Sequence, residues 1–185
     1  MGNEKDLFEW RRFGHWRTSA AKARFSAYVL WHMQDDSQLI DMARESGHLG
    51  GDYTLGVSEG FRRESAIALE LIVKAVIAKA LEAQAADPAT ECVPATHDLP
   101  KLWKQANLPV LPLEDRYRLQ LVKSVLTWSG RYATPRTVKA WEEETRAFDA
   151  LKEPPPSPGK FIARTPIKFG WIEFDRLYQM AHSFL

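Results

Sequence analysis

The chain has 185 residues, of which 45% are hydrophobic and 26% charged, and its formal net charge at pH 7 is +1. This composition is typical of one folded globular domain and excludes an intrinsically disordered chain. The near-neutral charge also excludes a global field that would attract nucleic acid or an anionic lipid surface. Any contact with RNA or DNA must therefore come from a local patch of side chains.

Cysteine and histidine usage narrows the chemistry further. Cys92 is the single cysteine, which excludes an intramolecular disulfide and a cysteine-based metal site. The five histidines have no metal-ligand spacing, and no glycine-rich phosphate loop is present, so we expect no metal and no cofactor. The N-terminal stretch lacks a signal-peptide core, and no apolar run approaches the roughly 18 residues of a membrane span. We expect a cytoplasmic protein that does not bind membranes.

Apolar periodicity predicts helices along most of the chain. The first is expected over residues 18–46, capped by Thr18 or Ser19, with a point of interruption at 35–37. Five of the ten glycines fall within residues 46–60, which predicts a loop there. The strongest helical pattern is 61–86, which has no Gly or Pro and is apolar nearly all round its middle. Such a helix belongs at the centre of a bundle.

The second half of the chain carries shorter helical patterns separated by prolines and glycines. Helices are expected within 95–112, over 112–137 with its end near Gly130, over 138–153, and over the last dozen residues. The PPPSPG stretch at 154–159 cannot be helical, and 160–169 is the one weak strand candidate.

The predicted fold class is therefore all-α, a four- to five-helix bundle with a Pro-linked C-terminal segment. Residues 1–153 are expected to form the bundle domain. Residues 154–185 are expected to form a linker and a C-terminal helix that packs on the same domain.

Two charges interrupt the apolar central helix, Glu70 and Lys74, in the favourable i, i+4 order. One interpretation is a solvated pair on a wet stripe shared with Arg63 and Leu81, worth a few tenths of a kcal/mol. The other is that the pair lies inside the bundle or faces a groove. Buried charge is costly unless it is paired and hydrogen-bonded, so the second interpretation requires further polar partners.

His97, in ATHDLPKLW, is one candidate partner for this pair. The alternative is a histidine at a helix start that is hydrogen-bonded to backbone, with Thr96 or Asp98 as the cap. Arg131 and Tyr132, in WSGRYATP, are the other candidates because they follow the expected end of the fourth helix.

Three runs, ALELIVKAVIAKAL, THDLPKLW and LTWSGRYATP, together resemble bacterial proteins of the HEPN superfamily, with the likeness best over residues 61–136. The resemblance implies a small helical bundle, a homodimer, and a role in toxin–antitoxin, defence or RNA-processing systems. Active members cleave RNA without a metal, using an Arg and a His four to six residues apart that meet their copies across the dimer.

The one such spacing in this chain, Arg176 to His182, lies outside the matching region and has Leu177 where a polar residue is usual. Chance alone accounts for one occurrence in a chain with this many arginines and histidines. The resembling subgroup instead keeps a Glu-x-x-x-Lys and a His-Asp-Leu. The polar members of these motifs are here Glu70, Lys74, His97 and Asp98, which could bind RNA or phosphate, or hold two helices in register.

The functional hypothesis that follows is a HEPN-like RNA-associated protein, either a metal-independent ribonuclease or an inactive RNA-binding relative. His97 is expected to transfer a proton, and Arg131 and Lys74 to contact phosphate. Glu70 would orient Lys74 or His97. The full candidate set is His97 and Arg131 as catalytic residues, with Lys74, Glu70, Asp98 and Tyr132 as substrate-binding residues.

The alternative hypothesis is a non-enzymatic interaction module, such as an immunity or adaptor protein. The near-zero net charge favours it, as does the aromatic stretch EWRRFGHW, although such stretches more often pack a terminus on its own domain. The expected partners are RNA, a protein such as an antitoxin, and a second copy of the chain. A solvent-filled groove at the polar cluster would favour the RNA hypothesis, and a closed internal network would favour the module.

Overall fold

The computed structural model describes residues 12–34, 36–48, 52–84, 92–129, 137–149 and 168–185. Within these segments there are seven α-helices, one π-helix and no strand, which confirms the all-α fold class. The elements are α2 (Phe13–His32), α3 (Ser37–Glu45), α4 (Asp52–Ala83), α5 (Leu99–Gln105), α6 (Leu113–Ser124), η1 (Val125–Ser129), α7 (Val138–Asp149) and α8 (Trp171–His182).

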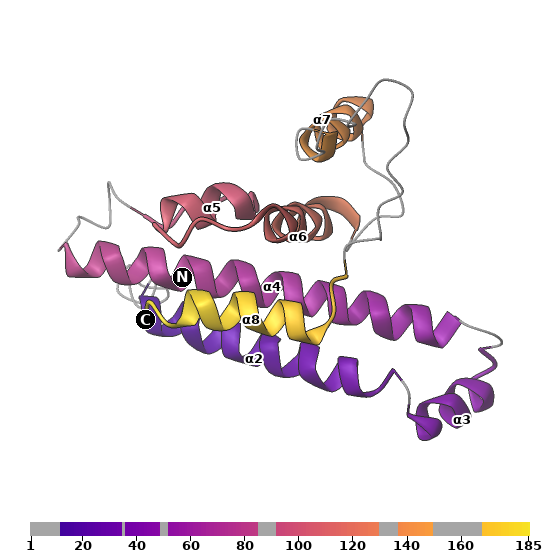
Figure 1. Ribbon diagram of the computed structural model, residues 1–185. Coiled ribbons are helices and arrows are strands. Elements are labelled where there is room, and N and C mark those ends of the chain that lie inside the picture. The colour runs from indigo at the N-terminus through magenta and orange to yellow at the C-terminus, as the bar shows by residue number, and fades with distance from the viewer. Residues whose placement is uncertain (1–11, 35, 49–51, 85–91, 130–136, 150–167) are drawn as a thin grey trace, which may run out of the picture.

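The long helix α4 is the centre of the arrangement (Figure 1). Helix α2 lies antiparallel beside it, with the Trp31 and Phe61 ring centroids 4.9 Å apart. Helix α8 packs on α2 and α4, and its Asp175 Oδ1 accepts a hydrogen bond from Arg24 Nε of α2 at 2.7 Å. Helices α5 and α6 cover the other side of α4. Helix α7 stands apart from the bundle and contacts α6, where Phe148 O accepts a hydrogen bond from the Tyr117 hydroxyl at 3.1 Å.

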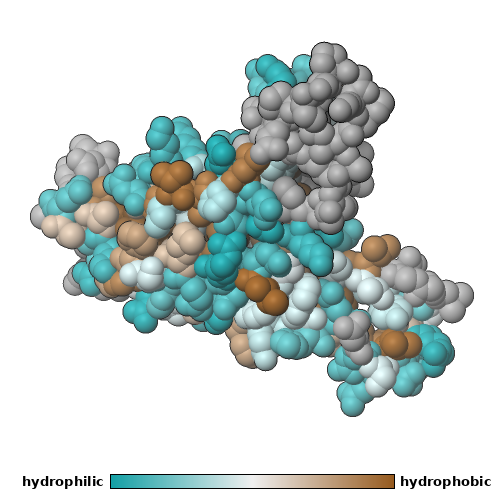
Figure 2. Space-filling model, viewed as in Figure 1, coloured by the Kyte–Doolittle hydropathy of each residue, from teal (hydrophilic) through white to brown (hydrophobic). Residues whose placement is uncertain are grey.

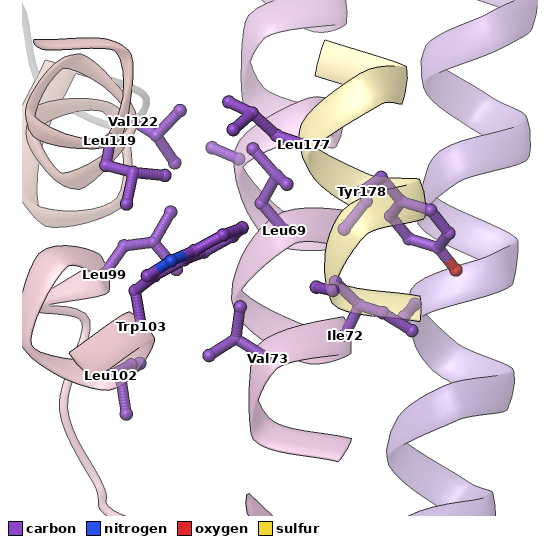
Figure 3. Packing of buried hydrophobic residues seen from close by; sticks show 14 of the residues in the cluster. Leu69, Ile72, Val73, Leu99, Leu102, Trp103, Leu119, Val122, Leu177 and Tyr178 are labelled. Atoms are coloured by element: carbon purple, nitrogen blue, oxygen red, sulfur yellow. The ribbon is translucent and has the colours of Figure 1, made fainter. Parts of the chain in front are cut away.

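The hydrophobic core confirms the central position predicted for the apolar helix. Leu69, Ile72 and Val73 of α4 are fully buried, and Figure 3 shows them between α5 and α6 on one side and α8 on the other. The helical residues of the main core cluster come from α2, α4, α5, α6, η1 and α8, and none comes from α3 or α7. Five α-helices thus form the packed body of the described chain.

The prediction of a loop over residues 46–60 is wrong for most of that range. Helix α4 begins at Asp52 and runs through Gly56 and Gly60. Packing against α2 explains the difference, because a Cβ on Gly60 would lie only 3.3 Å from Leu30 Cδ1. Helix propensity alone disfavours glycine inside a helix, but at Gly60 the lack of a side chain lets α2 and α4 approach each other closely.

The start of the first helix also differs from the prediction. Helix α2 begins at Phe13, five residues before the expected cap, and the Thr18 hydroxyl donates to Gly14 O within the helix at 2.8 Å. The interruption predicted at 35–37 is confirmed, because Asp36 caps α3 through a 2.8 Å hydrogen bond from Gln38 N to its Oδ1.

The later helices follow the predicted order with shorter bounds. The helix predicted within 95–112 is the shorter α5. The helix predicted over 112–137 corresponds to α6, which ends at Ser124 and is followed by the π-helix η1. The expected continuation to residue 137, the proline stretch and most of the strand candidate lie outside the described residues. The predicted C-terminal helix is confirmed as α8. It begins directly after Gly170, where a Cβ would lie 2.8 Å from Trp31 Cη2.

Asp115 of α6 joins that helix to α8. Its Oδ1 accepts hydrogen bonds from Arg118 Nη1 at 2.7 Å and from Arg176 Nη2 at 2.5 Å, and its side chain is 3% exposed. Burial raises the pKa of Asp115, but the two guanidinium groups outweigh burial and hold the pKa below its ordinary value. Arg176, half of the Arg–His spacing, is therefore engaged in a structural ion pair.

Across the described part of the chain, no helix has both the length and the apolarity needed to cross a bilayer.

Candidate functional site

Glu70 and Lys74 lie one turn apart near the middle of α4, and both side chains are buried, with 8% and 7% exposure. Lys74 Nζ donates a hydrogen bond to Glu70 Oε1 at 2.6 Å. The interpretation of a solvated surface pair is therefore wrong. The apolar residues around the pair place it in the bundle interior, where each charge depends on the other.

The Lys74 ammonium has a second contact, which comes from α2. Its Nζ lies 5.5 Å from the centroid of the Trp16 ring. An ammonium group over an indole face is attracted by the ring quadrupole, and the attraction is stronger away from water. The aromatic N-terminal stretch thus packs on its own domain at Trp16, whereas Trp10 lies outside the described residues.

His97 completes the cluster from the segment before α5. Its Nδ1 lies 2.9 Å from Glu70 Oε2, so the two oxygens of Glu70 bind two different cations or donors. A carboxylate accepts hydrogen bonds, which assigns the proton of this contact to Nδ1 of His97. The His97 side chain is 50% exposed, and its Nε2 has no hydrogen-bond partner among the residues that the structure describes.

Asp98 has a different role from its neighbour. It is the N-cap of α5, and its Oδ1 accepts from Lys101 N at 3.2 Å. Its Oδ2 accepts from Lys123 Nζ of α6 at 2.7 Å. Asp98 therefore supplies the cap and ties α5 to α6. His97 binds the carboxylate of Glu70, and among the described residues its ring has no hydrogen bond to backbone, although the cap named in that alternative, Asp98, is confirmed.

The remaining candidates separate into two groups. Arg131 and Tyr132 lie outside the described residues, directly after η1, a π-helix of the kind that often occurs at functional sites. Arg176 and His182 are not brought together. Arg176 pairs with Asp115, while the His182 ring stacks on Tyr178 with centroids 6.2 Å apart.

We call the cluster of Trp16, Glu70, Lys74 and His97 the Glu70 site. Its Glu70–Lys74 ion pair is buried, whereas the His97 imidazole is half exposed to solvent. A carboxylate that holds one imidazole nitrogen leaves the other free to accept or donate a proton, which is the arrangement of general acid–base catalysis. The described residues contain no group of three side chains suited to a metal ion. The ammonium beside the one carboxylate would also repel a cation.

Sequence reasoning missed Trp16 as a member of the site. Its signal is present but indirect: α2 is antiparallel to α4, so an aromatic residue near the start of α2 lies beside the later turns of α4. That register becomes visible only when both helices have correct bounds.

Comparisons with protein-family models, with curated proteins and with solved structures gave no match. The fold and the site define an all-α helical protein with a buried Glu–Lys pair and a half-exposed histidine. The resemblance to HEPN proteins stays a prediction from the three sequence runs, because none of these comparisons shows a family.

Proposed function

We propose that this protein is a HEPN-like RNA-associated protein in which the Glu70 site presents the His97 imidazole to the ribose–phosphate backbone. The observation that carries the proposal is the 2.9 Å contact between His97 Nδ1 and Glu70 Oε2, combined with an imidazole that is half exposed. A buried carboxylate would be a costly way to hold a surface histidine that had no need of a fixed orientation.

The reaction that such an imidazole supports is metal-independent RNA cleavage. His97 Nε2 accepts the proton of a ribose 2′-hydroxyl, and the 2′-oxygen forms a bond to the adjacent phosphorus. The bond from phosphorus to the 5′-oxygen breaks, and that oxygen takes up a proton from the imidazolium or from water. The products are a 2′,3′-cyclic phosphate and a 5′-hydroxyl end.

The burial of Lys74 changes the role that we assign to it. Its Nζ is bonded to Glu70 and covered by the Trp16 ring, which leaves little of it for a phosphate group. In the proposal Lys74 is a positioning residue that holds Glu70 in place. The phosphate contact then belongs to Arg131, with Tyr132 beside it in the sequence.

The test uses the purified full chain and total RNA, with EDTA in every reaction. Wild type, His97→Gln and the control His48→Gln, which alters an exposed histidine after α3, are compared by gel and by end-group analysis. The proposal expects chelator-resistant cleavage with cyclic phosphate ends in wild type and in the control, and none in His97→Gln. Intact RNA together with no salt-sensitive RNA binding in wild type would refute it.

The second candidate function is the interaction module, and a specific observation favours it. The Glu70–Lys74 pair is a closed internal contact, whereas α2 and α8 each expose large apolar side chains, among them Phe25 at 67% and Ile172 at 78%. Apolar side chains on adjacent helices are common in protein interfaces. Refutation of RNA cleavage and of RNA binding would leave this candidate.

A further inference from the structure

A separate pocket of about 590 Å³ lies between α5, the segment that follows it, and α6, and Ala147 of α7 also lines it. It shares no residue with the Glu70 site. Its volume is within the range of sites that bind small molecules in proteins, roughly 300–1,000 Å³. Figure 2 shows a mostly hydrophilic face on which apolar side chains are interspersed around α5 and α6.

The deeper wall of the pocket is apolar. Trp103, Leu111 and Leu119 line it, and each is at most 6% exposed. The Trp103 Nε1 already donates to Pro109 O at 2.9 Å, so the indole offers only carbon atoms to a ligand. A ligand that fills this wall must have an apolar body, because a polar group there would lose its hydration without gaining a hydrogen bond.

Two cations line the same pocket, Lys104 from α5 and Arg116 from α6. Both are exposed, and neither has a carboxylate within 4 Å in the part of the chain that the structure describes. Other cations of α6 behave differently, since Arg118 and Lys123 are both paired with aspartates. Two exposed cations beside an apolar wall complement a ligand with a single anionic head.

We propose that this pocket binds a small amphiphilic anion, a molecule with an aliphatic or aromatic body and one terminal carboxylate or phosphate. The body lies against Trp103, Leu111 and Leu119, and the head lies between Lys104 and Arg116. The proposal is independent of the RNA function, because the pocket and the Glu70 site have no residue in common.

The experiment compares ligands that differ only in the head group. Decanoate, decyl phosphate and decanol are titrated into the full chain by calorimetry, at concentrations below micelle formation. Decanoate or decyl phosphate is expected to bind about ten-fold more tightly than decanol, which corresponds to about 1.4 kcal/mol for the charged head. The two anions distinguish a carboxylate ligand from a phosphate ligand. Equal affinity for all three, or no binding of any, would overturn the proposal.

Variants test whether the head lies between Lys104 and Arg116, as proposed. The double variant Lys104→Gln/Arg116→Gln alters exposed side chains and is expected to fold normally. It should bind the anions about ten-fold more weakly and decanol unchanged. Lys101→Gln is the matched control, because Lys101 is an exposed lysine of α5 that does not line the pocket. An equal loss in the control variant would contradict the assignment.

The indole N–H of Trp103 reports on the site directly. Its cross-peak in a ¹H–¹⁵N spectrum is assigned by its loss in Trp103→Phe, and it is expected to shift when decanoate is added to wild type. A titration in which that peak stays in place while others move would show that the anion binds elsewhere, and would overturn the proposal.

Discussion

Glu70 Oε2 and His97 Nδ1 lie 2.9 Å apart although 27 residues separate them in the chain. The contact joins the central helix to the segment that begins α5. The same carboxylate receives the Lys74 ammonium on its other oxygen. One buried side chain therefore links three elements, since Trp16 of α2 covers that ammonium.

Removal of the imidazole should destabilise the protein. In His97→Ala the buried oxygen Glu70 Oε2 loses its hydrogen-bond donor, and we expect the free energy of unfolding to fall by about 1–3 kcal/mol. The exposed control His48→Ala should change stability by less than about 0.5 kcal/mol. Urea denaturation of the three proteins measures the difference. A His97→Ala protein as stable as the control would show that the contact contributes nothing.

The Glu70–Lys74 pair should show strong non-additivity. Lys74→Met leaves the Glu70 carboxylate buried without its cation, and we expect a loss of about 3–5 kcal/mol. In Glu70→Leu/Lys74→Met both charges are gone, and the expected loss is smaller than that of the single variant. A double-mutant cycle by denaturant titration measures the coupling. Additive losses would mean that the two side chains do not interact.

Two glycines should respond in opposite directions to alanine. At Gly170 a Cβ would lie 2.8 Å from Trp31 Cη2, so Gly170→Ala should destabilise by about 1–3 kcal/mol through forced repacking. At Gly56, inside α4, a Cβ meets nothing within 4 Å, and Gly56→Ala should stabilise by about 0.5–1 kcal/mol. Thermal unfolding of both variants tests the α2–α8 contact and the N-terminal extension of α4 together.

Acid should weaken the α6–α8 connection at Asp115. Its pKa is lower in the folded protein than in the unfolded chain, so its contribution is present above the unfolded pKa of about 3.9 and is lost as pH falls through the folded value. The stability difference between wild type and Asp115→Asn should therefore be constant above about pH 5 and shrink below about pH 4. A difference that stays unchanged to pH 2 would contradict the assignment.

Alkali should act at Tyr178 of α8. Burial raises the pKa of its hydroxyl, so the stabilisation is complete below the unfolded value of about 10 and is lost as pH rises through the folded value. Wild type should lose more stability than Tyr178→Phe as pH rises above about 10. Parallel curves for the two proteins would show that the pKa of the hydroxyl is the same in the folded and unfolded states, which would contradict the shift.

The central helix and its ion pair could be predicted from the sequence because both depend on local periodicity. The middle of the predicted helix is apolar on nearly every face, so a charge there lies either on one solvated stripe or beside a polar partner inside the bundle, and the sequence left both open. His97 was one of three candidate partners, beside Arg131 and Tyr132, and the sequence did not choose between them.

The parts that the sequence did not reveal depend on contacts between distant segments. Gly56 and Gly60 are typical of a loop, yet both lie in α4, and the close approach of Leu30 explains the glycine at Gly60 alone. Trp16 joins the site through the register of α2 on α4, and Asp115 is buried only because α8 brings Arg176 to it. No local sequence pattern predicts these tertiary contacts.

The most direct test of the account is the tautomer of His97, read from the imidazole ¹⁵N shifts of the full chain at pH 8, with the resonances assigned by their loss in His97→Gln. The account predicts a proton on Nδ1, donated to Glu70, and an unprotonated Nε2 that can accept a proton from substrate. A proton on Nε2 with none on Nδ1 would contradict it, because the carboxylate would then not hold the imidazole and the open nitrogen could not act as a base.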